Sequence, residues 1–265
     1  MKIAICFYGL VGSVSDKNGV GRLLDPKIAY DYYKKNIFNK NDDVDIFIHS
    51  YSVETKQKLI DLYNPVDYTI ENQVLFPQSE KHPFLNKRIF EKLKMAFFKF
   101  FKNSLYIKLK DLKTKESFRA HSRWYSVNQS INLMRNHELK NNFSYDCVMS
   151  TRLDIGFFTP VSFKDYDMSY FYASNWNDAP INEKNIQANY LNQNIGKGFL
   201  DLWFFSNSNL MFKFSKLFDK INDYPINPHT SSYNHLIKLT KRIKYVFYRW
   251  HDHELIRRKF FESEK

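Results

Sequence analysis

Residues 2–12 have the sequence KIAICFYGLVG, an apolar run that ends abruptly at glycine. Short apolar runs rich in β-branched and aromatic residues are typical of strands buried on both faces. We therefore expect a buried strand over residues 2–8. The glycine-rich segment after it leads into a predicted helix from about Pro26 to Phe38, because proline is favoured in the first turn of a helix.

The same alternation of elements continues along the chain. A second strand is expected at Val44 to Ser50, where the sequence is VDIFIHS, and a third at about Asp67 to Glu71. A helical stretch from Val53 to Leu62 separates them. The order strand, helix, strand, helix, strand implies a parallel sheet with right-handed crossovers. The sequence thus predicts an α/β fold with a Rossmann-type, mostly parallel sheet flanked by helices.

Length and composition fit one globular unit. The chain has 265 residues, of which 43% are hydrophobic and only 7 are glycine, so disordered and collagen-like classes are excluded. Cys6 and Cys147 lie apart in apolar runs, which excludes zinc ribbons and disulfide scaffolds and predicts buried thiols in a reducing compartment. We expect a single domain over residues 1–265.

The start of the chain lacks the pattern of a secretory signal, and no run reaches the roughly 18 apolar residues of a membrane span. We expect a cytoplasmic protein, either in solution or bound peripherally to the inner face of the plasma membrane. The net charge is +12, and between Lys81 and Arg123 there are 13 Lys and Arg against 3 Asp and Glu. This excess predicts an anionic partner, or a solvated face.

Residues 84–155 contain neither glycine nor proline, a length sufficient for two helices. In the first helix, apolar residues recur every four positions from Leu85 to Leu112, with lysines between them. The pattern predicts a basic amphipathic helical insertion over residues 81–115. Two placements stay open: in the interface of an anionic membrane with the lysines on the headgroups, or with the aromatic stripe packed against the sheet.

The rest of the chain continues the α/β pattern. We expect helices at Glu116–Leu139, Leu210–Ile221 and Ser232–Arg242, and strands at Tyr145–Ser150, Tyr170–Ala173, Leu202–Phe205 and Tyr245–Tyr248.

Residues 145–155, YDCVMSTRLDI, form a predicted buried strand that ends in charge. Arg152 and Asp154 would lie at the strand exit, the edge where open α/β sheets bind ligands. Asp154 suits a divalent metal that holds a diphosphate, and Arg152 suits a phosphate or the carboxylate itself. The alternative is a structural ion pair at a strand end.

Taken together and in order, several segments resemble bacterial GT-A type polysaccharide glycosyltransferases, the enzymes of capsule and lipopolysaccharide assembly. The resemblance covers most of the chain outside the basic segment. The segments that carry it are KIAICFYGLVGS from residue 2, VDIFIHSYS from 44, SRWYSVNQSINLM from 122, YDCVMSTRLDI from 145 and LDLWFFSNSNLMFKF from 200.

The resemblance implies a Rossmann-like domain that binds a nucleotide-diphosphate sugar, with a carboxylate motif for metal (Mn²⁺ or Mg²⁺) and diphosphate. The family motif is Asp-x-Asp, whereas this chain has Arg152-Leu153-Asp154, so either Arg152 neutralises the diphosphate directly or Asp154 holds the metal with help from elsewhere. By the same resemblance, the nucleotide is contacted by Phe7 and by the glycine loop, which includes Gly9, Gly12 and Arg22. From the residues alone, an ordinary flexible connection stays open for this loop.

Two further groups could carry chemistry. Asp201, just before an apolar strand, lies where such enzymes place a carboxylate that binds the acceptor or acts as the base; its alternative is a cap of a helix or turn. His251 and His253 would share one face of a strand and bind metal there with Asp154, or else would belong to an exposed polar turn.

Three functions follow from these observations. The first is a glycosyltransferase that moves a sugar from a nucleotide-diphosphate donor to a surface polysaccharide, as a glycan or lipid-linked glycan acceptor. The second is a transferase of a phosphoryl-type group onto capsule sugars. The third is a non-enzymatic basic nucleic-acid binder, which we do not expect, because the aromatic residues follow core periodicity.

Overall fold

The structure, a computed structural model, describes residues 1–12, 23–77, 89–178, 198–249 and 251–256. Within these residues nine strands form one sheet in the order β3-β2-β1-β4-β7-β6-β8-β9-β5. Their bounds are β1 Ile3–Gly9, β2 Val44–Ser50, β3 Asp67–Ile70, β4 Cys147–Arg152, β5 Ile155–Phe157, β6 Phe171–Asp178, β7 Leu200–Ser206, β8 Ile243–Arg249 and β9 His253–Leu255.

The sheet is mostly parallel, as predicted. Strands β3, β2, β1 and β4 are parallel neighbours, and so are β6, β8 and β9. Strand β7 runs antiparallel between β4 and β6, and the short edge strand β5 runs antiparallel to β9. The α/β class is confirmed, and the antiparallel β7 brings its first residues to the edge where β1 and β4 end.

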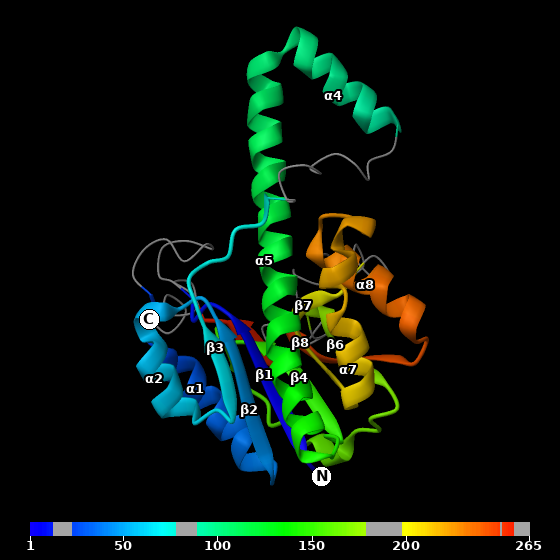
Figure 1. Cartoon of the computed structure of the whole chain (residues 1–265). Coiled ribbons are helices and arrows are strands. Elements are labelled where there is room, and N and C mark those ends of the chain that lie inside the picture. Colours follow the sequence, from blue (N-terminus) through cyan, green and yellow to red (C-terminus); the bar gives the residue numbers. More distant parts are fainter. Residues whose placement is uncertain (13–22, 78–88, 179–197, 250, 257–265) are drawn as a thin grey trace.

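Helices cover both faces of the sheet (Figure 1). Along β1 the side chains alternate: Ile3, Ile5 and Phe7 pack into a core cluster with α1 and α2, whereas Ala4 and Cys6 pack into a second cluster with α5, α7 and α8. Helix bounds are α1 Pro26–Asn36, α2 Lys56–Tyr63, α4 Ile89–Phe101, α5 Asn103–Asn141, α7 Ser208–Ser215 and α8 Pro228–Leu239.

Helix α5 is far longer than the predicted helix from Glu116 to Leu139. Its second half packs on the sheet through apolar residues at helical spacing, whereas its first half projects beyond the sheet and packs against α4 (Figure 1). The described part of the predicted basic segment, residues 89–115, consists of α4 and the first turns of α5, and residues 81–88 lie outside the described residues. The buried residues of α5 are Ala120, Trp124, Val127, Ile131 and Met134.

The remaining differences lie at element ends and in the short strands. Asp25 caps α1 by accepting from the Lys27 backbone N–H, and α1 ends at Asn36, followed by a 3₁₀ turn. The expected helix from Leu210 to Ile221 is α7 followed by a separate 3₁₀ segment. Strands β5 and β9 were not predicted. In the part of the chain that the structure describes, no helix is long and apolar enough to cross a bilayer.

The two halves of α5 should contribute differently to the stability of the fold. Trp124 is buried against Phe214, whereas Leu112 on the same helix is exposed. We expect Trp124→Ala to lower the free energy of unfolding by about 3–5 kcal/mol, because it opens a cavity in the core. Leu112→Ala should change it by less than about 0.5 kcal/mol. Chemical denaturation of both variants tests this, and equal effects would contradict the packing described.

Candidate functional site

The candidate site lies where β1, β4 and β7 meet at the carboxyl edge of the parallel strands. Tyr8 at the end of β1 pairs with Arg152 at the end of β4, and Thr151 pairs with Trp203 of the antiparallel β7. This register brings Asp201, near the start of β7, to the edge that Arg152 occupies. The two carboxylates singled out from the sequence thus lie on neighbouring strands: Asp154 comes just after β4, and Asp201 lies near the start of β7.

Arg152 and Asp154 form a bidentate ion pair. Arg152 Nε donates to Asp154 Oδ1 at 2.6 Å, and the Arg152 terminal nitrogen Nη2 donates to Oδ2 at 2.7 Å. Asp154 is 1% exposed. Burial alone would lower the Arg152 pKa, but the Asp154 carboxylate outweighs it and raises that pKa, so the guanidinium stays charged. The ion pair is held in one orientation, with the Arg152 guanidinium nearer to solvent than the Asp154 carboxylate.

Two neighbours hold this pair in place. Gly12 has a left-handed φ of +90°, and a Cβ there would lie 3.2 Å from the Asp154 Cβ, so the chain after β1 packs closely against the Asp154 side chain. Tyr33 of α1 donates its hydroxyl to the Arg152 carbonyl at 2.7 Å, and its oxygen lies 2.7 Å from Thr151 Oγ1. The structure therefore places Gly12, one of the residues assigned to the nucleotide, in contact with Asp154.

A second charged cluster surrounds Asp201, which is 1% exposed. Its Oδ1 lies 2.9 Å from His229 Nδ1, and its Oδ2 is ion-paired with Arg123. Arg123 comes from the middle of α5 and His229 from the first turn of α8. The sequence singled out Asp201 but did not indicate its grouping with Arg123 and His229, because these residues lie 78 and 28 positions away and share no motif with it.

The contacts of His229 determine its tautomer. Nδ1 lies 2.8 Å from the Phe199 carbonyl oxygen and 2.9 Å from the Asp201 carboxylate. Both partners accept hydrogen bonds, so Nδ1 carries the proton and Nε2 carries the lone pair. Burial, with a further contribution from Arg123, lowers the pKa of His229 to about 4. The imidazole is therefore neutral at pH 7.

Gly198 fits the start of β7 against α8. A Cβ at this position would lie 2.8 Å from the His229 carbonyl oxygen, closer than real side chains approach. The next residue, Phe199, donates its N–H to the same oxygen at 3.1 Å. The glycine therefore permits the backbone approach that sets His229 beside Asp201.

Tyr8 connects the two charged clusters. Its hydroxyl lies 3.1 Å from the Asp201 carbonyl oxygen and 3.2 Å from that of Leu202. Burial raises the Tyr8 pKa, and the nearby Arg123 and Arg152 partly offset the rise. Both guanidinium groups thus lie close enough to Tyr8 to act on it.

Of the residues assigned to the nucleotide, the structure places Phe7 away from the edge. It is fully buried, with its ring 4.8 Å from the ring centroids of both Tyr33 and Tyr63. Its role is to anchor β1 in the core. Gly9 lies at the edge with a left-handed φ of +89°, and Arg22 lies outside the described residues.

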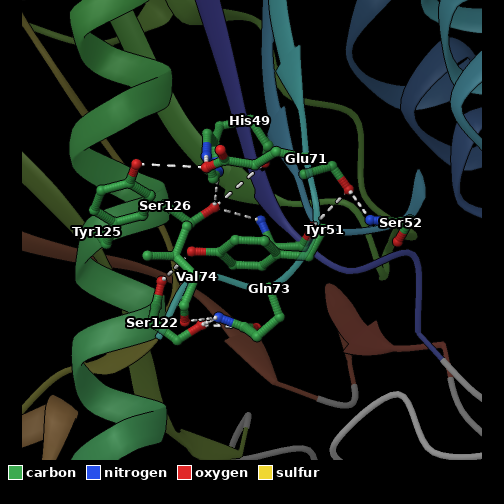
Figure 2. Close-up of polar contacts among 11 residues, drawn as sticks. His49, Tyr51, Ser52, Glu71, Gln73, Val74, Ser122, Tyr125 and Ser126 are labelled. Atoms are coloured by element: carbon green, nitrogen blue, oxygen red, sulfur yellow. Dashed lines mark hydrogen bonds and ion pairs between the residues drawn. The ribbon is translucent and has the colours of Figure 1, made fainter. Parts of the chain in front are cut away.

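A polar cluster around His49, Glu71 and Ser126 joins the end of β2 to α5 (Figure 2). Ser126 Oγ accepts from the Gly9 N–H at 2.9 Å and lies 2.7 Å from His49 Nδ1, while His49 Nε2 lies 3.0 Å from Glu71 Oε1. Burial lowers the His49 pKa, and Glu71 opposes that shift. Ser126 and His49 are both fully buried, so these residues stabilise the end of β1.

His251 and His253 do not share a face. His251 lies in a turn and is exposed, with Nδ1 3.0 Å from Asp252, whereas His253 begins β9 and is buried. His253 stacks on Phe157, and its Nε2 lies 3.1 Å from Ser174 Oγ. Within the described ranges, no three His, Cys, Asp or Glu side chains are grouped to hold a metal ion. Among the residues that the structure describes, His251 and His253 therefore do not form a metal centre with Asp154.

No family model matches this chain, and no curated protein matches it. The interpretation of the site therefore rests on its own geometry and chemistry.

The buried histidines predict loss of stability in acid. Burial lowers the pKa of His253 to about 3, below the ordinary 6.5. The unfolded chain takes up this proton from pH 6.5 downward and the folded chain resists it, so the contribution to stability is full above pH 6.5 and declines down to about pH 3. The variant His253→Phe keeps the ring packing but has no titrating group at this position. When the pH falls from 7 to 4.5, we expect its free energy of unfolding to decrease by roughly 2–3 kcal/mol less than that of the wild type.

Denaturation at both pH values measures this difference. Ser174→Ala is the matched control, since it removes the same hydrogen bond and keeps the titrating ring; it should retain the wild-type pH dependence. Parallel pH dependence in the wild type and His253→Phe would contradict the assignment.

Proposed function

We propose that this protein is a glycosyltransferase that moves a sugar from a nucleotide-diphosphate donor to a hydroxyl group of a surface-polysaccharide acceptor. The observation that carries the proposal is the meeting of two arginine-carboxylate clusters, Arg152 with Asp154 and Arg123 with Asp201, at the carboxyl edge of β1 and β4. Edges of this kind bind nucleotides in open α/β sheets. The order of the sequence motifs supports the same reaction class.

The arginines suit a diphosphate. Their guanidinium groups are fixed by the carboxylates before a ligand arrives, and planar guanidinium groups bind phosphate oxygens through two parallel hydrogen bonds. Arg152 is 15% exposed at the side chain and Arg123 is 24%, whereas their carboxylate partners are almost fully covered. The cations are therefore the members that a phosphate can reach. Since the described residues do not form a metal centre, the proposal assigns charge neutralisation to Arg152 and Arg123.

His229 suits the proton transfer better than Asp201 does. Both oxygens of Asp201 already face a cation or a hydrogen-bond donor. His229 is neutral and partly exposed, and its lone pair is on Nε2. In the proposed reaction Nε2 accepts the proton of the acceptor hydroxyl as its oxygen attacks the sugar, and the bond from sugar to diphosphate breaks. Asp201 holds Nδ1–H and stabilises the imidazolium that forms.

The first test is donor binding. At a nucleotide concentration of 100 Kd, the wild type should gain about 2.7 kcal/mol of stability, seen as a rise in Tm of several degrees. The double variant Arg152→Gln with Asp154→Asn removes both charges of the pair and should lose that rise. Thermal unfolding with a panel of nucleoside diphosphates and nucleotide sugars, each with and without Mn²⁺, measures it.

The matched control is Arg135→Gln with Glu138→Gln, which removes another arginine-carboxylate pair, near the far end of α5. It should keep the rise in Tm. A wild-type protein that is folded and shows no rise with any nucleotide would overturn the proposed donor class, and a rise that needs Mn²⁺ would overturn the arginine assignment.

The second test concerns the base. We expect His229→Gln to lower kcat for sugar transfer by roughly 10²- to 10⁴-fold, which is the rate enhancement that general acid-base catalysis typically provides. The nucleotide-induced rise in Tm should stay, because Arg152 and Arg123, the residues proposed to hold the diphosphate, are unchanged in this variant. Single-turnover transfer assays with the donor found above measure the change.

His235→Gln is the control, since His235 is a second buried histidine of α8 that bonds Tyr224 and the Lys213 carbonyl away from this edge. It should keep wild-type turnover. If His229→Gln kept normal turnover and Asp201→Asn lost it, the general base would be Asp201 instead of His229.

A further inference from the structure

The hairpin made by α4 and the first turns of α5 carries an apolar face that no described part of the chain covers. Phe100 is 80% exposed, Phe101 74% and Leu93 63%, and Phe97 is half-exposed. At 3.6 residues per turn these four side chains lie within an arc of about 100°, so they form one continuous stripe. Large apolar side chains gathered in this way mark an interaction surface.

Lysines accompany this stripe. Exposed lysines lie in the last turn of α4, in the connection between the two helices and along the start of α5, where Ile107 and Leu112 are also exposed. Within residues 99–112 the only acidic residue is Asp111, and it is paired with Lys115. The exposed lysines are Lys99, Lys102, Lys108 and Lys110.

The hairpin projects away from the sheet on the side where β1 ends (Figure 1). The hairpin therefore reaches a flat partner before the body of the protein does. Its residues belong to a separate part of the molecule from the charged clusters at the sheet edge, so what binds the hairpin is independent of the reaction proposed above.

From these observations we infer that the α4–α5 hairpin docks on the surface of an anionic lipid bilayer. Phenylalanine and leucine side chains enter the boundary between headgroups and acyl chains, and the lysines stay at the level of the anionic headgroups. A bilayer satisfies both features at once. A nucleic acid would pair with the lysines and leave the apolar stripe in water, and a second copy of the hairpin would bring like charges together.

The test is co-sedimentation of the full-length protein with vesicles of phosphatidylcholine alone and of phosphatidylcholine with 30% phosphatidylglycerol. We expect binding to the anionic vesicles that weakens with added salt. The triple variant Phe97→Ser, Phe100→Ser, Phe101→Ser should lose at least about tenfold in partition coefficient. Replacing the four exposed lysines with glutamine should abolish the preference for phosphatidylglycerol.

The matched control is Val66→Ser, Leu75→Ser, Leu139→Ser, three exposed apolar side chains outside the hairpin. It should bind vesicles as the wild type does. Because the substituted phenylalanines are exposed, the triple variant should keep the wild-type Tm, and the nucleotide-induced rise in Tm tests the proposed reaction separately.

Failure of the folded wild type to bind either kind of vesicle would overturn the inference, as would a triple variant that binds like the wild type. A concentration-dependent dimer that the triple variant abolishes, with no vesicle binding, would assign the stripe to a second copy instead. Salt-sensitive binding to DNA in place of vesicles would assign the lysines to nucleic acid.

Discussion

Burial of β1 on both faces is the constraint on which the rest of the structure depends. A strand covered by α1 and α2 on one side and α5 on the other has no room for charge along its length, so its apolar run continues until the chain leaves the sheet. Polar chemistry is confined to the carboxyl end. Arg152 and Asp201 lie there because β4 is registered against β1 and β7 against β4, while Gly9 and Gly12 take the left-handed φ values of the turn that follows β1.

Charge at this edge is arranged so that each buried carboxylate has a cation beside it. Asp154 and Asp201 are almost completely removed from solvent, which would be costly without Arg152, Arg123 and the Nδ1–H of His229. The carboxylates thereby hold the guanidinium groups in one orientation without a ligand. Such preorganisation lowers the entropic cost of binding a phosphate, because the arginine side chains are already ordered.

The sequence was a good guide to the central elements and a poor one to the site. Apolar runs located β1, β2, β4 and β7 to within two residues, because burial determines both the run and the strand. Strands β5 and β9, three residues each, leave too short a pattern. Arg152 beside Asp154 was foreseeable from adjacency, whereas Arg123 and His229 reach Asp201 only through the packing of α5 and α8, which no local pattern encodes. The start of helix α5 was misplaced because the boundary between the two helices falls at Lys102, and no glycine or proline marks it in the sequence.

The unbroken length of α5 has a geometric consequence. One continuous helix joins the hairpin at Asn103 to Arg123, and at 1.5 Å per residue these positions are about 30 Å apart. If the hairpin lies on a bilayer, the length of α5 sets the distance between the lipid surface and the charged edge of the sheet. This distance is at most about 30 Å, when the helix axis is perpendicular to the bilayer. An acceptor tethered to lipid would then have to extend that far before its hydroxyl group met His229, so the helix would select acceptors by reach.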